Sequence, residues 1–148
     1  MTFVVDTNVA VVANGREWLL TAPECVIACN RQLAEIKDSG RIAVDDGWKI
    51  LKEYRNNLRE SGEPGAGDAF WKWVLSNSRN PERCDFVSAA PFPDNDELKA
   101  FDPADRVFVT VALAHSERPP ILQATDLKWK NFVGVLSEHG VNVRFVCG

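Results

Sequence analysis

Short apolar runs that alternate with longer segments of helical periodicity most constrain the fold of this chain. The runs lie at 2–5, 41–44, 119–125 and 141–146. A short run that is apolar at almost every position is typical of a strand buried on both faces, as in a parallel sheet covered by helices. The order of runs and helical segments therefore predicts an α/β protein with a short central parallel sheet and helices on both faces.

The helical segments carry their own start and stop signals. Thr21, followed three residues later by Glu24, predicts a capping box, and Gly40 is expected to end that helix. Residues 62–67, with the sequence GEPGAG, are expected to form a flexible joint. The remaining helices are expected at 48–61, 68–77, 104–116 and 129–140, and a candidate strand lies at 86–89 in an otherwise loop-like stretch.

Length and composition predict a single domain spanning residues 1–148. A chain of 148 residues with 45% apolar content can bury one sizeable core. No stretch approaches the roughly 20 apolar residues that a membrane span needs. Residues 1–13 lack a basic leader, so no signal peptide is expected, and the expected location is the cytoplasm.

The cysteines and the net charge exclude few further classes of protein. The chain contains no CxxC pair, and both histidines lie far in sequence from the cysteines, so a zinc site is not expected. Cys25 and Cys29, four residues apart on a predicted helix, are expected to be small buried apolar residues. The net charge of −4 is not typical of a nucleic-acid-binding protein. That argument weakens if several acids neutralise bound cations.

Carboxylates follow two of the predicted strands at the point where each strand ends. Asp6 follows the strand at 2–5, and Asp126 follows the strand at 119–125. Parallel sheets bind ligands outside the carboxyl ends of their strands, so these side chains are expected at the same edge, with Glu53 and Asp105 as further candidates. Gathered carboxylates repel one another unless a cation compensates them, and ligands that are all oxygen favour Mg²⁺ or Mn²⁺.

Each acid also has a purely structural interpretation. Asp6 can cap the turn after its strand, and Glu53 can pair with Lys49 one helical turn away. Asp105 lies at the third helical position after Asp102, an N-cap, where an acid interacts favourably with the helix dipole. Asp102 is the alternative metal ligand. Asn8 is a residue type common in turns.

Four segments resemble, in order and spacing, the motifs of PIN-domain nucleases. They are VVDTNV (4–9), LKEY (51–54), DPADRVFVTVALA (102–114) and ATDLKW (124–129). Proteins of this family are compact α/β nucleases that cut RNA with Mg²⁺ or Mn²⁺ held by acidic residues. Many are VapC-type toxins of toxin–antitoxin pairs. The resemblance implies the same fold, cofactors and activity here.

The resemblance also assigns roles to residues. Asp6 matches the first metal ligand, Glu53 the helix acid, Asp105 the acid of the third motif and Asp126 the last acid. Asn8 and Thr125 match supporting positions. Two features depart from the family pattern: Leu127 and Lys128 stand where many members carry a further acid, and the segment 61–95, with Trp71 and Trp73, is long. The tryptophans are expected in the core rather than as a base-stacking platform, and the long segment is a candidate for shaping substrate access or a partner surface.

The resulting hypothesis is a metal-dependent ribonuclease in which a metal-bound hydroxide attacks the phosphodiester. The expected partners are an RNA substrate, single-stranded or structured, an antitoxin protein and a second copy in a homodimer, with no membrane; a DNA substrate stays open. One alternative is a catalytically inactive PIN-like module that binds RNA or protein. Another is a phosphohydrolase with Asp6 as nucleophile, which usually needs an acid two residues later, where this chain has Asn8.

Overall fold

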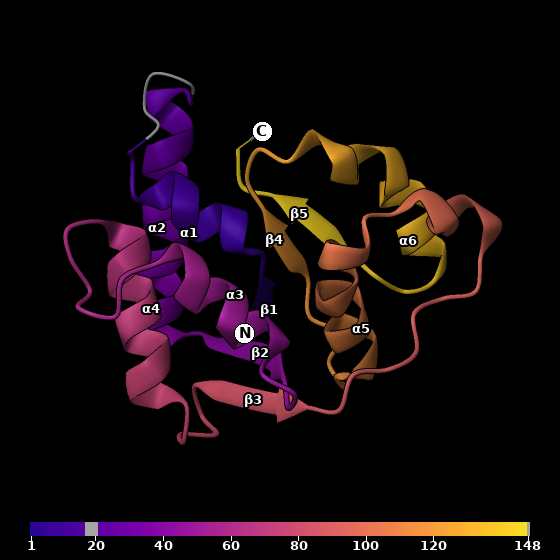
Figure 1. Ribbon diagram of the computed structural model, residues 1–148, viewed down its shortest axis with the longest axis horizontal. Helices are drawn as coiled ribbons and strands as arrows, with labels where there is room; N and C mark the ends of the chain where they lie inside the picture. Colours follow the sequence, from indigo (N-terminus) through magenta and orange to yellow (C-terminus); the bar gives the residue numbers. More distant parts are fainter. Residues whose placement is uncertain (17–20, 148) are drawn as a thin grey trace.

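The protein is built on one sheet of five parallel strands, shown in Figure 1. The computed structural model describes residues 1–16 and 21–147. The strand order is β3-β2-β1-β4-β5, and every neighbouring pair is parallel. The predicted α/β class is therefore confirmed. The strands are β1 (Thr2–Val5), β2 (Arg41–Asp45), β3 (Cys84–Val87), β4 (Ile121–Gln123) and β5 (Val143–Phe145).

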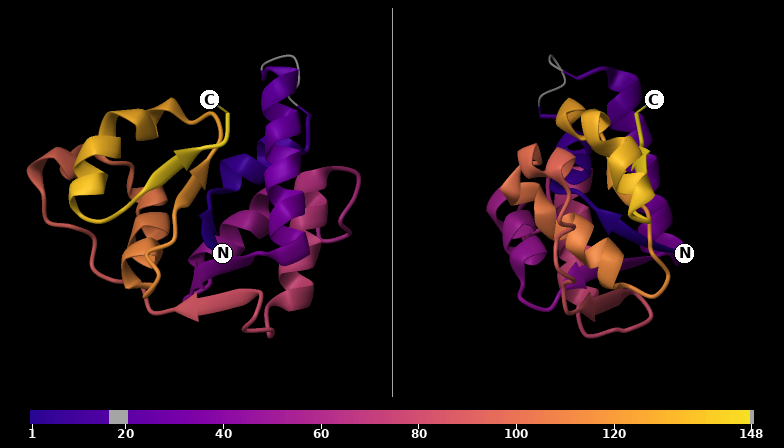
Figure 2. Two further views of the ribbon diagram at one scale, coloured as in Figure 1. Left: turned by 180° about the vertical axis from the view of Figure 1, so that it is seen from behind. Right: turned by 90° about the vertical axis from the view of Figure 1, so that its right-hand side faces the viewer.

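Helices flank the sheet. In Figures 1 and 2, the first four helices gather at one end of the molecule, and α5 and α6 lie at the other. Among the residues described there are six α-helices: α1 (Thr7–Ala13), α2 (Pro23–Ser39), α3 (Lys49–Asn57), α4 (Ala66–Asn77), α5 (Arg106–Ala114) and α6 (Val133–Glu138). The same residues also form three short 3₁₀ helices: η1 (Asp96–Ala100), η2 (Pro103–Asp105) and η3 (Leu127–Phe132). No helix in 1–16 or 21–147 combines the length and apolar character needed to cross a membrane.

Two helix starts differ from the sequence prediction. Helix α1 was not expected, and it begins directly after β1 because the Asp6 carboxylate accepts a hydrogen bond from the Asn8 amide at 2.8 Å. The predicted capping box at Thr21 is wrong: the N-cap of α2 is Ala22, and no side chain caps this end. Pro23 opens the helix without needing an amide hydrogen bond, which makes a side-chain cap less necessary. Gly40 ends α2, as predicted.

The long segment after α3 belongs to the core. Asp68 is fully buried and accepts hydrogen bonds from the Arg59 amide at 2.8 Å, the Gly65 amide at 3.1 Å and the Arg16 guanidinium at 2.8 Å, which fixes the predicted joint at 62–67. A side chain at Gly67 would overlap the Ala10 carbonyl, so glycine lets α4 pack closely on α1. As predicted, the Trp71 side chain lies in the core, whereas Trp73 is half-buried and packs against it.

A disulfide joins Cys25 in α2 to Cys147 after β5. Cys25 and Cys29 are both buried, as expected, but the interpretation of Cys25 as a simple apolar residue is wrong because its sulfur is bonded. The two bonded cysteines are 122 residues apart, and neither local spacing nor helix periodicity relates them.

The strand order reverses between β1 and β4. From β1 the chain adds β2 and then β3 on one side, and β4 and β5 lie on the other side. In open parallel sheets, such a reversal creates a crevice at the carboxyl ends of the two central strands. The residues that follow β1 and β4 are Asp6 and the stretch 124–126, so the fold brings the first and last sequence motifs to one crevice.

Candidate metal centre

Asp6 is the most deeply buried acid of the crevice, with 5% of its surface exposed. One carboxylate oxygen, Oδ1, caps α1 through the Asn8 amide. The other oxygen, Oδ2, is buried and completes no hydrogen bond of good geometry within residues 1–16 and 21–147, although the neighbouring Gln123 side chain lowers the pKa of this carboxyl group. A buried carboxylate oxygen without a partner costs free energy, so the capping interpretation explains only half of this side chain.

Burial dominates the electrostatics of Asp6. Loss of solvation raises the pKa of Asp6 to about 7, and the nearby charges of Asp105 and Glu53 raise it further. The Asn8 amide and the side chain of Gln123 act in the opposite direction. Asp6 therefore holds a proton over part of the neutral pH range. A bound cation would instead favour the ionised form of this carboxyl group.

Asn8 and Thr125 join the two loops that carry Asp6 and Asp126. The Asn8 side-chain oxygen accepts a hydrogen bond from the Thr125 amide at 2.8 Å, and the Asn8 amide group donates to the Thr125 hydroxyl at 3.3 Å. These contacts connect the end of β1 to the end of β4. The supporting positions proposed from sequence thus contact each other.

Lys128 lies among three acids of the crevice. Its ammonium nitrogen is 2.9 Å from the Asp102 carboxylate, 3.8 Å from that of Asp126 and 4.0 Å from that of Asp105. Hydrogen bonding to Lys128, followed by the Ala104 amide, lowers the pKa of Asp102. The lysine that departs from the family pattern is therefore the counter-ion of the outer acids.

Asp102 and Asp105 make different contacts at the start of α5. Asp102 is the residue that caps, accepting a hydrogen bond from the Ala104 amide at 3.0 Å. Asp105 precedes α5 and makes no side-chain capping hydrogen bond. Burial raises the pKa of Asp105 to about 6, with Asp102, Asp126 and Glu53 adding to the rise and Lys128 opposing it. Helix capping thus accounts for Asp102, whereas Asp105 lies in the first turn, where the helix-dipole interpretation places an acid.

Glu53 projects from α3 toward the same crevice. No ion pair between Glu53 and Lys49 occurs in the part of the chain that the structure describes, so the expected helix pair is not formed. Burial raises the pKa of Glu53; the neighbouring Thr7 hydroxyl lowers it, and Asp102 raises it. Behind it, the Tyr54 hydroxyl donates to the Val5 carbonyl and ties α3 to the end of β1.

Sequence reasoning missed two polar groups of the crevice. The Thr7 hydroxyl and the Gln123 amide nitrogen are both buried, and neither completes a hydrogen bond within the described residues. Gln123 interrupts the apolar strand β4, which is the signal that could have identified it. Together with Asp6 Oδ2, these are three buried polar atoms that complete no hydrogen bond of good geometry among the described residues, with Gln123 next to Asp6 and Thr7 next to Glu53.

The acids are near one another but not tightly clustered. No three of the five carboxylates have ligand atoms all within 4.8 Å of one another in residues 1–16 and 21–147. The residues that would hold a metal ion here are Asp6, Glu53, Asp105 and Asp126, with Asp102 as the alternative. The buried Asp6 Oδ2 atom, which completes no hydrogen bond of good geometry among the described residues, is the observation that fits such an ion.

A cavity of about 490 Å³ opens beside this crevice. Glu53 lies in its wall, together with Lys49, Arg106 and Asp45. The Asp45 carboxylate caps α3 through the amides of Lys49 and Ile50, each at 2.9 Å. The wall of the cavity thus contains two cationic side chains, Lys49 and Arg106, as well as Glu53.

A compact group of acids and a histidine lies elsewhere, at the start of the strands. The His115 Nε2 atom is 2.9 Å from the Asp85 carboxylate, and its Nδ1 atom accepts a hydrogen bond from the Glu117 amide. In the neutral ring, Nε2 therefore carries the proton and has no lone pair for a metal. Arg41 pairs with Asp85 at 3.2 Å, so this group forms a structural ion-pair network.

Comparisons of the chain with models of known protein families, with curated proteins and with solved structures give no match.

Proposed function

We propose that this protein is a metal-dependent endoribonuclease of the PIN type, active in the cytoplasm, with Mg²⁺ or Mn²⁺ bound in the crevice between β1 and β4. The observation that carries the proposal is the buried, unpartnered Oδ2 atom of Asp6, which lies near Glu53 and Asp105. The metal would supply an activated water and stabilise the leaving oxygen. Asp6, Glu53, Asp105 and Asp126 would hold it.

The other residues of the crevice have positioning roles in this proposal. Asn8 and Thr125 keep the loops of Asp6 and Asp126 at a fixed separation through their mutual hydrogen bonds. Lys49, in the wall of the adjacent cavity, is placed to attract the phosphate backbone of the RNA. A metal held by these carboxylates would compete with Lys128 for them, and Lys128 would then be available to a phosphate oxygen.

A cleavage assay tests the proposal. The purified protein is expected to cut single-stranded RNA with Mn²⁺ or Mg²⁺ and to be inactive with chelator, and Asp6→Asn is expected to lower the rate roughly a thousandfold. Asp38→Asn, an exchange of the same type at an exposed position, is the control for contaminating ribonucleases and should retain full activity. Equal activity of Asp6→Asn and the wild type would refute the nuclease proposal.

The inactive PIN-like module is the second candidate, and Lys128 is the observation that favours it. The Lys128 ammonium lies within 4.0 Å of three acids and can take the place of a metal as their counter-ion. In that case Mn²⁺ should not raise the melting temperature of the wild type, but it should raise that of Lys128→Met. A rise in the wild type favours the nuclease. An antitoxin or a second copy of the chain would be a partner in either case.

A further inference from the structure

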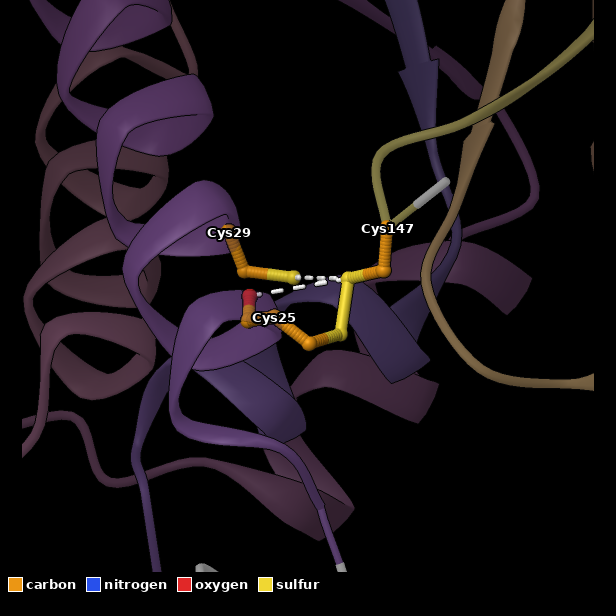
Figure 3. A group of neighbouring side chains, drawn as sticks. All are labelled: Cys25, Cys29 and Cys147. Atoms are coloured by element: carbon orange, nitrogen blue, oxygen red, sulfur yellow. Dashed lines mark hydrogen bonds between the residues drawn. A yellow bond between two sulfur atoms is a disulfide. The ribbon is translucent and has the colours of Figure 1, made fainter.

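Three cysteine sulfurs meet at a second place in the molecule, apart from the acidic crevice. Figure 3 shows Cys25 and Cys29 projecting from α2 toward Cys147, which follows β5. Cys25 and Cys147 form the disulfide, and the Cys29 sulfur lies 3.7 Å from the Cys147 sulfur. Cys29 is a free, fully buried thiol. All three sulfurs lie within 4.8 Å of one another.

We propose that, when the disulfide is reduced, Cys25, Cys29 and Cys147 form a thiolate site for a thiophilic divalent cation such as Zn²⁺. With zinc–sulfur bonds of about 2.3 Å, sulfurs at tetrahedral positions are roughly 3.8 Å apart. The 3.7 Å between Cys29 and Cys147 already matches this spacing. Cys25 and Cys29, four residues apart on one helix, face the same side, so opening the disulfide is the main adjustment needed.

The fourth coordination position of this site is open. No fourth histidine, cysteine or carboxylate joins the three sulfurs among residues 1–16 and 21–147. Three protein ligands with a free fourth position accept water or a small exogenous thiol. The sulfurs themselves identify the metal class, because thiolates prefer soft or borderline cations over Mg²⁺ and Mn²⁺, which suit the carboxylate crevice.

The disulfide and the metal site are alternative states of the same sulfurs. A phosphine reductant converts the disulfide to two thiols: the phosphorus is oxidised to the phosphine oxide with oxygen from water, and the hydrogens pass to the sulfurs. Binding of the metal then forms three metal–sulfur bonds and releases three thiol protons. In a reducing compartment such as the cytoplasm proposed above, the thiols prevail over the disulfide.

Titration of the phosphine-reduced protein with Co²⁺, a spectroscopic substitute for zinc, tests the proposal. We expect a sulfur-to-metal charge-transfer band that saturates at one Co²⁺ per chain, and its loss when Zn²⁺ is added. Carboxylate-bound Co²⁺ gives no such band, so the acidic crevice does not interfere. The oxidised protein, in which two of the three sulfurs are bonded to each other, should show no band.

Cys29→Ser and Cys84→Ser provide the matched pair of variants. Cys84 is also a free buried cysteine, but it lies in β3 and outside the group of three sulfurs. Cys29→Ser should weaken Co²⁺ binding by more than about a hundredfold, which is more than the loss of a residue that only supports a ligand causes. Cys84→Ser should bind Co²⁺ as the wild type does. A reduced wild type without the band, or a Cys29→Ser variant that binds equally tightly, would overturn the proposal.

A second measurement keeps the test decisive if reduction unfolds the chain. Metal binding that requires the folded arrangement of three sulfurs also drives folding. Zn²⁺ should then restore the native circular dichroism spectrum of the reduced wild type but not that of reduced Cys29→Ser. Equal recovery of both proteins, or recovery of neither, would contradict the three-sulfur site.

Discussion

Replacing Asp6 by asparagine should stabilise the metal-free protein at neutral and alkaline pH. The exchange keeps an oxygen that can cap α1 through the Asn8 amide. It also removes the ionisation of a buried carboxyl group that has no cation partner and has one oxygen without a hydrogen bond. The wild type must either hold a proton at Asp6 or bury the charge, whereas the variant does neither.

The size of the effect follows from the pKa. A rise from 3.8 to about 7 in the folded state corresponds to about 4 kcal/mol of folding free energy, since a tenfold change in proton affinity is worth about 1.4 kcal/mol. Between these two values the unfolded chain releases the proton and the folded chain keeps it. The stability contributed by Asp6 is therefore present below about pH 4 and is lost progressively up to about pH 7.

Urea unfolding in chelator, from pH 4 to pH 8.5, measures this loss. The difference in unfolding free energy between Asp6→Asn and the wild type should grow with pH, by up to about 4 kcal/mol, and level off above pH 7. The exposed Asp38→Asn variant should follow the wild type at every pH. Parallel curves for the wild type and Asp6→Asn would refute the reasoning, because they would mean that Asp6 ionises without cost in the folded state.

Three further measurements test other parts of the structure. In the wild type, Mn²⁺ at a hundred times its dissociation constant should raise the melting temperature by roughly 5 to 10 degrees. Asp105→Asn should lose most of this rise, and an undiminished rise would make Asp102 the next ligand to test. Trp71→Ala should cost roughly 3 to 5 kcal/mol in urea unfolding and the half-buried Trp73→Ala less, and equal losses would contradict their different burial. Cys147→Ser should lower the stability of the oxidised protein by up to about 5 kcal/mol, because the disulfide closes a loop of more than a hundred residues, and full reduction should bring variant and wild type together.

The sequence predicted the elements whose signals are local. The strands β1, β2, β4 and β5 follow from short apolar runs, and the parallel sheet follows from their alternation with helices. Helix α1 escaped prediction because its seven residues are too few to display a clear helical period, and its start depends on the carboxylate of Asp6. The predicted capping box failed because Thr21 and Glu24 satisfy the sequence pattern without making its hydrogen bonds.

The candidate site was predictable in part for a topological reason. Asp6 and Asp126 follow neighbouring strands, so the rule for the carboxyl ends of parallel strands places them at one crevice without any knowledge of side-chain positions. Glu53 and Asp105 were candidates whose place at the crevice only the resemblance favoured, because their spacing along the chain contains no distance information. The three-acid contact of Lys128 and the unpartnered atoms of Thr7 and Gln123 depend on tertiary packing alone.

The acids of the crevice form two layers: an outer layer of acids near Lys128 and an inner layer that consists of the buried Asp6. The layers differ in whether a cationic side chain lies near them. The outer acids share Lys128, whose ammonium lies 2.9 Å from Asp102 and 3.8 Å from Asp126, so one positive charge offsets part of their negative charge. Asp6 has no such partner and is shielded from water, which is why its pKa is high while that of Asp102 is low. A divalent ion would therefore gain most at the inner layer, where it replaces a proton rather than a lysine. Asp6, rather than the more accessible acids near Lys128, is therefore the residue whose substitution tests the metal hypothesis most directly.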